Sequence, residues 1–168
     1  MKLVEIKDVR VGQIRKNFDD LILVEAEKAN GFSHYQAFTE FGGFMNKDVK
    51  AHYKFLAMPI IGKIGITHRI EDNRLVEIPR EDLIVDDVVE YLDFDGFTVK
   101  AVICSVMTAL TAEETQYAFI TEDGQSEDTT LFEREEIGED SGIFTYTPKK
   151  IGILGVTHEF VNDREVQQ

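Results

Sequence analysis

Hydrophobic residues along this chain fall in short runs separated by turn residues, a pattern that predicts strands. The runs are five to eight residues long and rich in β-branched and aromatic side chains; they include LILVEAE (21–27), YQAFTEF (35–41) and VKAVICSV (99–106). Pairs typical of tight turns lie between the runs: Asn30-Gly31, Gly42-Gly43, Asp95-Gly96, Asp123-Gly124 and Asn162-Asp163. The segments 88–94 and 97–103 flank Asp95-Gly96 and predict a hairpin. We therefore expect a mainly β protein.

One segment indicates a helix. Residues 111–114 read TAEE, the Thr-x-x-Glu pattern of a capping box, which suits the start of a short helix through Phe119. An extended strand suits the same residues equally well, so both alternatives stay open. In either case little helix is expected.

The same segment occurs twice in the chain. Residues 61–76 read IGKIGITHRIEDNRLV and residues 151–166 read IGILGVTHEFVNDREV, with seven identities in sixteen positions. Average residue usage gives roughly one identity by chance. Each copy carries two glycines and many β-branched residues, which favours strand over helix. The match indicates an internal repeat.

Weaker matches extend this repeat towards the N-terminus in the same order. FLAMP (55–59) resembles FTYTP (144–148), AFTEFGG (37–43) resembles AFITEDG (118–124), and residues 6–26 resemble residues 85–105. A period of 80 to 90 residues exceeds that of solenoid repeats. We expect two tandem β-rich repeats, 1–78 and 79–168, each a small SH3-like barrel or bent sheet, packed with pseudo-two-fold symmetry.

Composition places the chain among globular proteins. Of its 168 residues 43% are hydrophobic and 30% charged. No apolar run reaches the roughly 18 residues of a spanning helix, and the N-terminal residues lack the apolar core of a secretory signal. A cytoplasmic protein is expected. Cys104 is the only cysteine, so no intrachain disulfide forms, and its apolar surroundings predict a buried, inert thiol.

Charge distinguishes the two repeats. The net charge of −14 argues against direct binding to nucleic acid or to an anionic membrane, both of which require a basic surface. Residues 1–78 hold 12 Lys or Arg against 11 Asp or Glu, a net of +1. Residues 79–168 hold 6 against 21, a net of −15. The acid is therefore concentrated in the second repeat.

Residues 122–140 are the most acidic stretch. They include Arg134 as the only cation, and they coincide with an insertion of about seven residues around 124–147 relative to the first repeat. Its carboxylates are Glu122, Asp123, Glu127, Asp128, Glu133, Glu135, Glu136, Glu139 and Asp140.

These nine carboxylates are the candidate partner-binding residues. Their repulsion would be relieved by a basic partner surface, and spaced carboxylates can imitate the phosphates of DNA. The competing interpretation is a solvated loop that keeps the protein soluble. DFDG (93–96) and EDGQSED (122–128) lack the spacing of a calcium-binding loop, so no metal site is expected.

Each copy of the repeated segment contains a Thr-His pair, Thr67-His68 and Thr157-His158. Two imidazoles facing each other across a repeat interface could act as general base and general acid. The order Thr-His does not match the His-x-Thr or His-x-Ser pattern of duplicated phosphoester-cleaving proteins. A structural role at a strand end is the simpler hypothesis. The glycines shared by the two copies favour close strand packing or a bulge over phosphate binding.

Together these patterns predict a non-enzymatic acidic protein that occupies a basic protein surface and needs no cofactor. An inhibitor of phage or mobile-element type, acting in the host cytoplasm on a nucleic-acid-handling protein or a toxin, fits this description. The alternatives are a pseudo-symmetric hydrolase or small-molecule-binding protein using His68 and His158, and a structural component of a viral or other assembly. The oligomeric state is left open, with a homodimer allowed.

Overall fold

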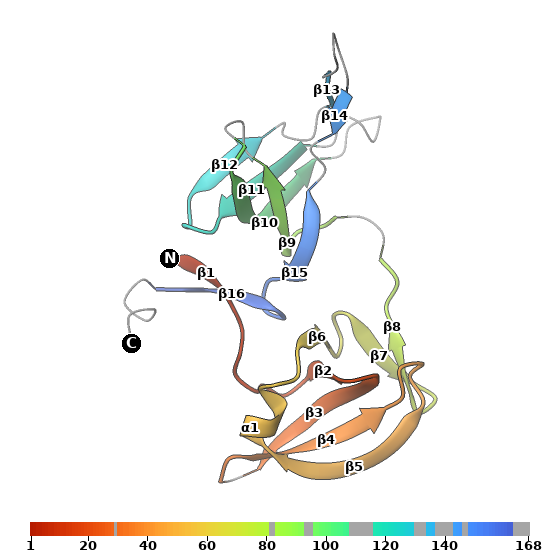
Figure 1. Ribbon diagram of the computed structural model, residues 1–168. Helices are drawn as coiled ribbons and strands as arrows, with labels where there is room; N and C mark the ends of the chain where they lie inside the picture. Colours follow the sequence, from red (N-terminus) through yellow and green to blue (C-terminus); the bar gives the residue numbers. More distant parts are fainter. Residues whose placement is uncertain are drawn as a thin grey trace. The chain divides into compact units, whose positions relative to one another are not determined.

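The computed structural model describes residues 1–28, 30–80, 83–92, 96–107, 116–129, 134–136, 143–145 and 148–162. Of these described residues 62% are in strands and 3% in helix, so the structure is mainly β, as the hydrophobic pattern predicted (Figure 1). Within the described ranges no helix is both long and apolar enough to cross a membrane. The chain divides into two compact units: residues 6–81, and residues 82–168 together with residues 1–5. The first has a net charge of +1 and the second of −15, so we call them the neutral unit and the acidic unit.

The neutral unit is built on a five-stranded antiparallel sheet with the order β5-β4-β3-β2-β6. Its elements are β2 (Gln13–Asn17), β3 (Asp20–Lys28), β4 (Phe32–Phe38), β5 (Phe44–Ala51), the one-turn helix α1 (His52–Phe55) and β6 (Ile60–Lys63). A hairpin of β7 (His68–Glu71) and β8 (Arg74–Glu77) follows.

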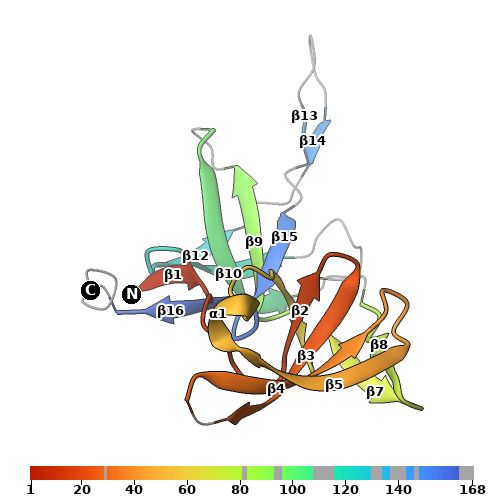
Figure 2. The same cartoon turned by 60° about the horizontal axis from the view of Figure 1, so that its bottom comes forward.

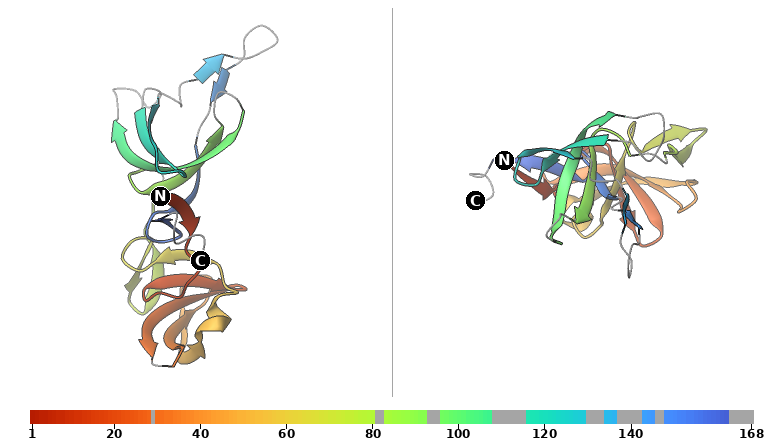
Figure 3. Two further views of the ribbon diagram at one scale, coloured as in Figure 1. Left: turned by 90° about the vertical axis from the view of Figure 1, so that its left-hand side faces the viewer. Right: turned by 90° about the horizontal axis from the view of Figure 1, so that it is seen from above.

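The acidic unit also contains a five-stranded antiparallel sheet, with the order β12-β11-β10-β9-β15. Its strands are β9 (Asp87–Leu92), β10 (Thr98–Met107), β11 (Gln116–Thr121), β12 (Ser126–Thr129) and β15 (Lys149–Ile153). Two small ladders complete it, β13 (Arg134–Glu136) with β14 (Ile143–Thr145), and β1 (Lys2–Glu5) with β16 (His158–Val161). Each five-stranded sheet is twisted and curved, as Figure 3 shows.

The two five-stranded sheets share strand order and bulge positions. The long strand of each is interrupted once, between Val24 and Ala26 in β3 and between Ile103 and Ser105 in β10. A second shift falls beside Gly62 where β6 joins β2, and beside Gly152 where β15 joins β9. A bulge changes the local twist of a strand and re-aims the side chains next to it. The sheets therefore agree in connectivity and at these two bulges, while a further shift between Ala37 and Phe38, where β4 pairs with β5, has no counterpart in the described pairing of β11 with β12.

The strand that begins at His68 in one unit and at His158 in the other has its partner strand at a different place in the chain in each unit. In the neutral unit β7 pairs with β8, which follows it directly, with His68 opposite Glu77. In the acidic unit β16 pairs with β1, from the N-terminus, with His158 opposite Glu5 (Figure 2). The two partner strands have nearly the same sequence, KLVEI (2–6) and RLVEI (74–78). Similar strands thus fill the same position in both units. The strand used by the acidic unit, β1, precedes the neutral unit's sheet in the chain, and the strand used by the neutral unit, β8, follows that sheet.

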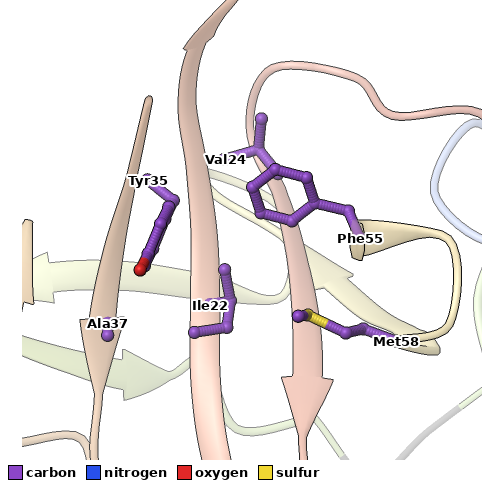
Figure 4. Close-up of a cluster of buried hydrophobic side chains, with 6 residues drawn as sticks. All are labelled: Ile22, Val24, Tyr35, Ala37, Phe55 and Met58. Atoms are coloured by element: carbon purple, nitrogen blue, oxygen red, sulfur yellow. The ribbon is translucent and has the colours of Figure 1, made fainter. Parts of the chain in front are cut away.

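Both faces of the neutral unit's sheet are covered, which explains the continuous apolar run in β3. Ile22 and Val24 face a cluster closed by α1 and the turn after it, through Phe55 and Met58 (Figure 4). Leu23, between them, faces the opposite cluster; it packs there with Ile14, Phe38 and Leu75. Strands buried on both faces lose the apolar–polar alternation of half-exposed ones.

The acidic unit repeats this two-faced core without an equivalent of α1 among its described residues. One cluster joins Val89, Tyr91, Ala101, Ile103 and Phe119. The other joins Leu3 of β1 with Val88 and Val102. The N-terminal strand therefore supplies the acidic unit with a core side chain.

A buried cation holds α1 in the neutral unit. Arg15 is 2% exposed, and its guanidinium donates five hydrogen bonds of 2.9–3.0 Å, one to the Gln13 side chain and four to backbone carbonyls. Two of those carbonyls belong to Phe55 and Met58 and two to Lys7 and Asp8. The planar guanidinium holds its N–H donors in a fixed geometry, which suits a site formed by several carbonyl oxygens. Arg15 thus joins the α1 region to the segment that precedes β2.

One local prediction is wrong. Cys104 is exposed, not buried, because it lies in the bulge of β10, where the alternation of side chains is interrupted. The first copy of the repeated segment is strand, as predicted, but a turn with a positive φ at Gly65 divides it into β6 and β7. Residues 111–119, for which helix and strand were both open, lie partly outside the described residues, and their described end, from Gln116, belongs to strand β11.

Candidate functional site

The Thr-His pair of the neutral unit closes a tight turn between β6 and β7. The Lys63 N–H donates to Thr67 Oγ1 at 2.8 Å, and Thr67 Oγ1 lies 2.7 Å from His68 Nδ1. The Gly65 N–H donates to the His68 carbonyl at 2.7 Å. In a neutral ring that carries its proton on Nε2, Nδ1 accepts the hydroxyl proton of the threonine. Backbone, hydroxyl and imidazole therefore form one hydrogen-bonded unit.

The acidic unit contains the same arrangement. The Ile153 N–H donates to Thr157 Oγ1 at 2.8 Å, and that oxygen lies 2.8 Å from His158 Nδ1. The Gly155 N–H donates to the His158 carbonyl at 2.7 Å. We call residues 62–68 and 152–158 the Thr-His clips.

The glycines shared by the two clips have distinct structural roles. A Cβ at Gly62 or Gly152 would overlap the threonine Oγ1 of its own clip and come against the imidazole that follows. Gly65 and Gly155 have φ values of +85° and +80°, which non-glycine residues adopt only with strain. Close packing beside a bulge therefore explains why glycine occupies positions 62 and 152, and the positive φ of the turn explains the glycines at positions 65 and 155.

Both clip histidines are buried, with 7% exposure at His68 and 6% at His158. Burial lowers the pKa of each ring, while the opposing carboxylate, Glu77 for His68 and Glu5 for His158, raises it by less. Lys100 lowers the pKa of His158 further. A buried neutral ring whose Nδ1 is engaged by the adjacent threonine is well suited to hold a strand end. Catalysis by the two histidines together stays a prediction.

The clip histidines make stability depend on pH. Because the pKa of each is lower in the folded protein, the unfolded chain binds protons first as the pH falls below about 6.5. Their stabilising contribution is present above that pH and is lost as the pH falls towards the folded pKa values. Each histidine contributes a slope of at most about 1.4 kcal/mol per pH unit in the free energy of unfolding.

Urea unfolding between pH 8 and 5 measures this slope, and NMR titration of the ring protons measures the two pKa values. We expect both to lie below that of a histidine in an unfolded peptide. Values at or above 6.5, or a free energy of unfolding that rises on acidification, would contradict the burial argument.

The structure places six of the nine candidate acidic residues on defined backbone. Glu122 and Asp123 lie in the turn between β11 and β12, and the others lie on short strands: Glu127 and Asp128 on β12, and Glu135 and Glu136 on β13. The remaining three, Glu133, Glu139 and Asp140, lie outside the described residues. β12 is an edge strand of the five-stranded sheet.

The start of the acidic stretch is fixed by the N-terminal strand and by β10. The Leu3 N–H donates to the Glu122 carbonyl at 2.9 Å, and the Glu122 N–H donates to the Lys100 carbonyl at 2.8 Å. Gly124, with a φ of +82°, packs against Met1. The backbone at the start of the acidic stretch is thus hydrogen-bonded both to the N-terminal strand β1 and to β10.

Sequence reasoning missed one acidic residue with a structural role. Asp87 is fully buried; it accepts the Ile84 N–H at 2.9 Å and lies 3.6 Å from Lys150 Nζ. Its position next to Asp86 in an acidic segment gave no sign of burial. Within the described ranges no group of three or more His, Cys, Asp or Glu side chains is arranged to hold a metal ion.

Comparison with family models, with curated proteins and with solved structures found no match for this chain. The two clips, the shared sheet order and the unequal charge of the units are the features from which a function can be inferred.

Proposed function

We propose that the protein is a non-enzymatic acidic binding protein whose acidic unit occupies a basic surface of another protein. The observation that carries this proposal is the separation of charge, −15 on one compact unit and +1 on the other. Like charges held on one folded unit repel each other and lower its stability. A basic partner relieves that repulsion and is steered to the site, which raises association rates about 10- to 1,000-fold at low salt.

Several acidic residues lie on extended backbone, which supports mimicry of nucleic acid. Glu127 and Asp128 are neighbours on β12, and Glu135 and Glu136 are neighbours on β13. A strand advances about 3.4 Å per residue with side chains on alternate faces, so it can present carboxylates at a regular spacing, as a DNA strand presents its phosphates. The partner class that follows is a protein that handles nucleic acid, or a cationic toxin, inhibited in the cytoplasm where a phage or mobile element would act.

We also propose that the two units arose by tandem duplication. The shared strand order, the matching bulges and the two Thr-His clips support this origin. KLVEI (2–6) and RLVEI (74–78) would then be the first strands of the two repeats, each used to complete the other unit. Barrel closure and pseudo-two-fold packing of the repeats stay predictions, as do the hydrolase and assembly-component alternatives.

Charge neutralisation tests the binding proposal. The triple variant Glu135→Gln, Glu136→Gln, Glu139→Gln should retain less than about a tenth of the wild-type affinity for a basic partner at 50 mM salt. The control variant Glu27→Gln, Asp48→Asn, Glu71→Gln changes the charge equally but on the neutral unit, and should bind as the wild type does.

The partner is first captured on the immobilised wild-type chain from an extract of the source organism, identified by mass spectrometry and purified. Affinities are then measured at 50 and 300 mM salt. Binding that is insensitive to salt, or equal losses in the two variants, would rule out a specific role for the acidic stretch.

A further inference from the structure

A phenylalanine occupies a backbone position in the neutral unit where glycine is preferred. Phe18 is the first residue of the two-residue loop between β2 and β3, which is closed by the pair Asn17 and Asp20. Its φ is +54°, a left-handed conformation that is strained for a bulky side chain. The side chain is also 92% exposed to solvent. Backbone strain lowers stability, and strained residues cluster at functional sites.

A second exposed phenylalanine lies at the same end of the sheet. Phe41 is 80% exposed in the turn between β4 and β5. The register pairs Leu21 with Phe38, so the β2–β3 and β4–β5 turns extend from the same end of neighbouring strand pairs (Figure 1). Arg74 donates a 2.8 Å hydrogen bond to the Phe41 carbonyl, which fixes the backbone while the ring faces solvent. Two aromatic rings are thus presented on anchored turns.

Each of the two phenylalanines has one acidic neighbour in the sequence. Asp19 follows Phe18 directly, Glu40 precedes Phe41 directly, and both are exposed. Asp20 closes the first loop and is half-buried. We call Phe18, Asp19, Asp20, Glu40 and Phe41 the aromatic tip.

We propose that the aromatic tip is an anchor for a protein partner that presents an apolar pocket rimmed by Lys and Arg. Exposed aromatic side chains that enter a pocket supply most of the binding energy at many interfaces. The flanking carboxylates complement a basic rim, and the same carboxylates oppose insertion into an anionic lipid layer. The tip belongs to the neutral unit, so this proposal does not depend on the role of the acidic unit.

Selection from a phage library of small folded domains with randomised concave surfaces, on the immobilised full-length chain, tests the proposal. We expect domains whose selected surface combines Lys or Arg with bulky apolar residues. Their affinity for the double variant Phe18→Gly, Phe41→Ser should fall at least about tenfold. The control variant Tyr53→Ala removes an aromatic ring that is 70% exposed on α1, and should bind these domains as the wild type does.

Thermal unfolding distinguishes lost binding from lost folding. Because glycine adopts a positive φ without strain, the single variant Phe18→Gly should melt about 4 °C above the wild type while it binds the selected domains less tightly. The proposal is overturned if no domain is enriched, or if the selected domains bind the double variant with unchanged affinity. It is also overturned if the wild type binds phosphatidylcholine vesicles and the double variant does not, because a lipid surface would then be the partner.

Discussion

Replacing Gly152 by alanine is expected to lower the free energy of unfolding of the acidic unit by about 3 kcal/mol. The added methyl group would overlap Thr157 Oγ1, which is itself held by the Ile153 N–H. Threonine has few alternative rotamers, so it can leave the site only by breaking that bond and its contact with His158. The cost combines overpacking, typically about 1–3 kcal/mol, with hydrogen bonds worth about 1 kcal/mol each.

Gly155 provides the matched control three residues further along the same clip. Its φ is +80°, and nothing lies within 4 Å of the place that a Cβ would take. Gly155→Ala should therefore cost only the backbone strain, about 1 kcal/mol. Urea unfolding of both variants, and of Gly62→Ala in the neutral unit, measures the difference. Equal losses at positions 152 and 155 would contradict the close contact between glycine and threonine.

The second large effect is expected from Leu3→Ala, and it should appear far from the substitution in sequence. Leu3 is 7% exposed and packs with Val88 and Val102 in the core of the acidic unit. Removal of a buried leucine costs about 2–5 kcal/mol, depending on how far the cavity collapses. The loss of stability should fall on residues 83–162, although the neutral unit begins only three residues after Leu3 in the chain.

Leu75→Ala is the reciprocal variant. Leu75 is 4% exposed and packs with Ile14, Leu23 and Phe38, so its loss should destabilise the neutral unit. Hydrogen exchange read by mass spectrometry assigns the lost protection to segments of each variant. If Leu3→Ala weakened residues 6–80 instead, the assignment of β1 to the acidic unit would be wrong.

The strand content was predicted well from the sequence, and the clip residues were found by comparing the two copies of the repeated segment, because both depend on local chemistry. β-branched runs form strands wherever a sheet accepts them. The match between 61–76 and 151–166 was detectable because the clip requires a particular residue at four of the seven shared positions: glycine for close approach and for positive φ, threonine for the backbone bond, histidine for the buried ring.

The strand partners could not be predicted, because they depend on non-local pairing. A four-residue strand such as β1 has no periodicity of its own, and nothing near it in the chain indicates that it pairs with β16. The likeness of residues 2–6 to residues 74–78 was the available signal. It was hidden because the repeat boundary, placed at residue 78, put both segments in the same repeat.

The candidate sites likewise include features that the local sequence indicates and features that depend on non-local packing. Thr-His pairs could be found by comparing two copies of one segment, yet their burial depends on strands that pack over them. Phe18 has no sequence signature, because a positive φ at a phenylalanine contradicts local preference and is imposed by the hairpin. Asp87 lies beside Asp86 in an acidic segment, and charge composition alone does not distinguish a buried carboxylate from a solvated one.

The pairing of β1 with β16 also sets the order in which the chain can fold during synthesis. Residues 2–5 leave the ribosome long before residues 158–161, their partners. At about 5–20 residues per second, the N-terminal strand waits roughly ten to thirty seconds for that partner. The neutral unit has β8 directly after β7 and can fold meanwhile. The acidic unit is therefore the last to form, and its charge becomes a compact surface only when translation has passed β16.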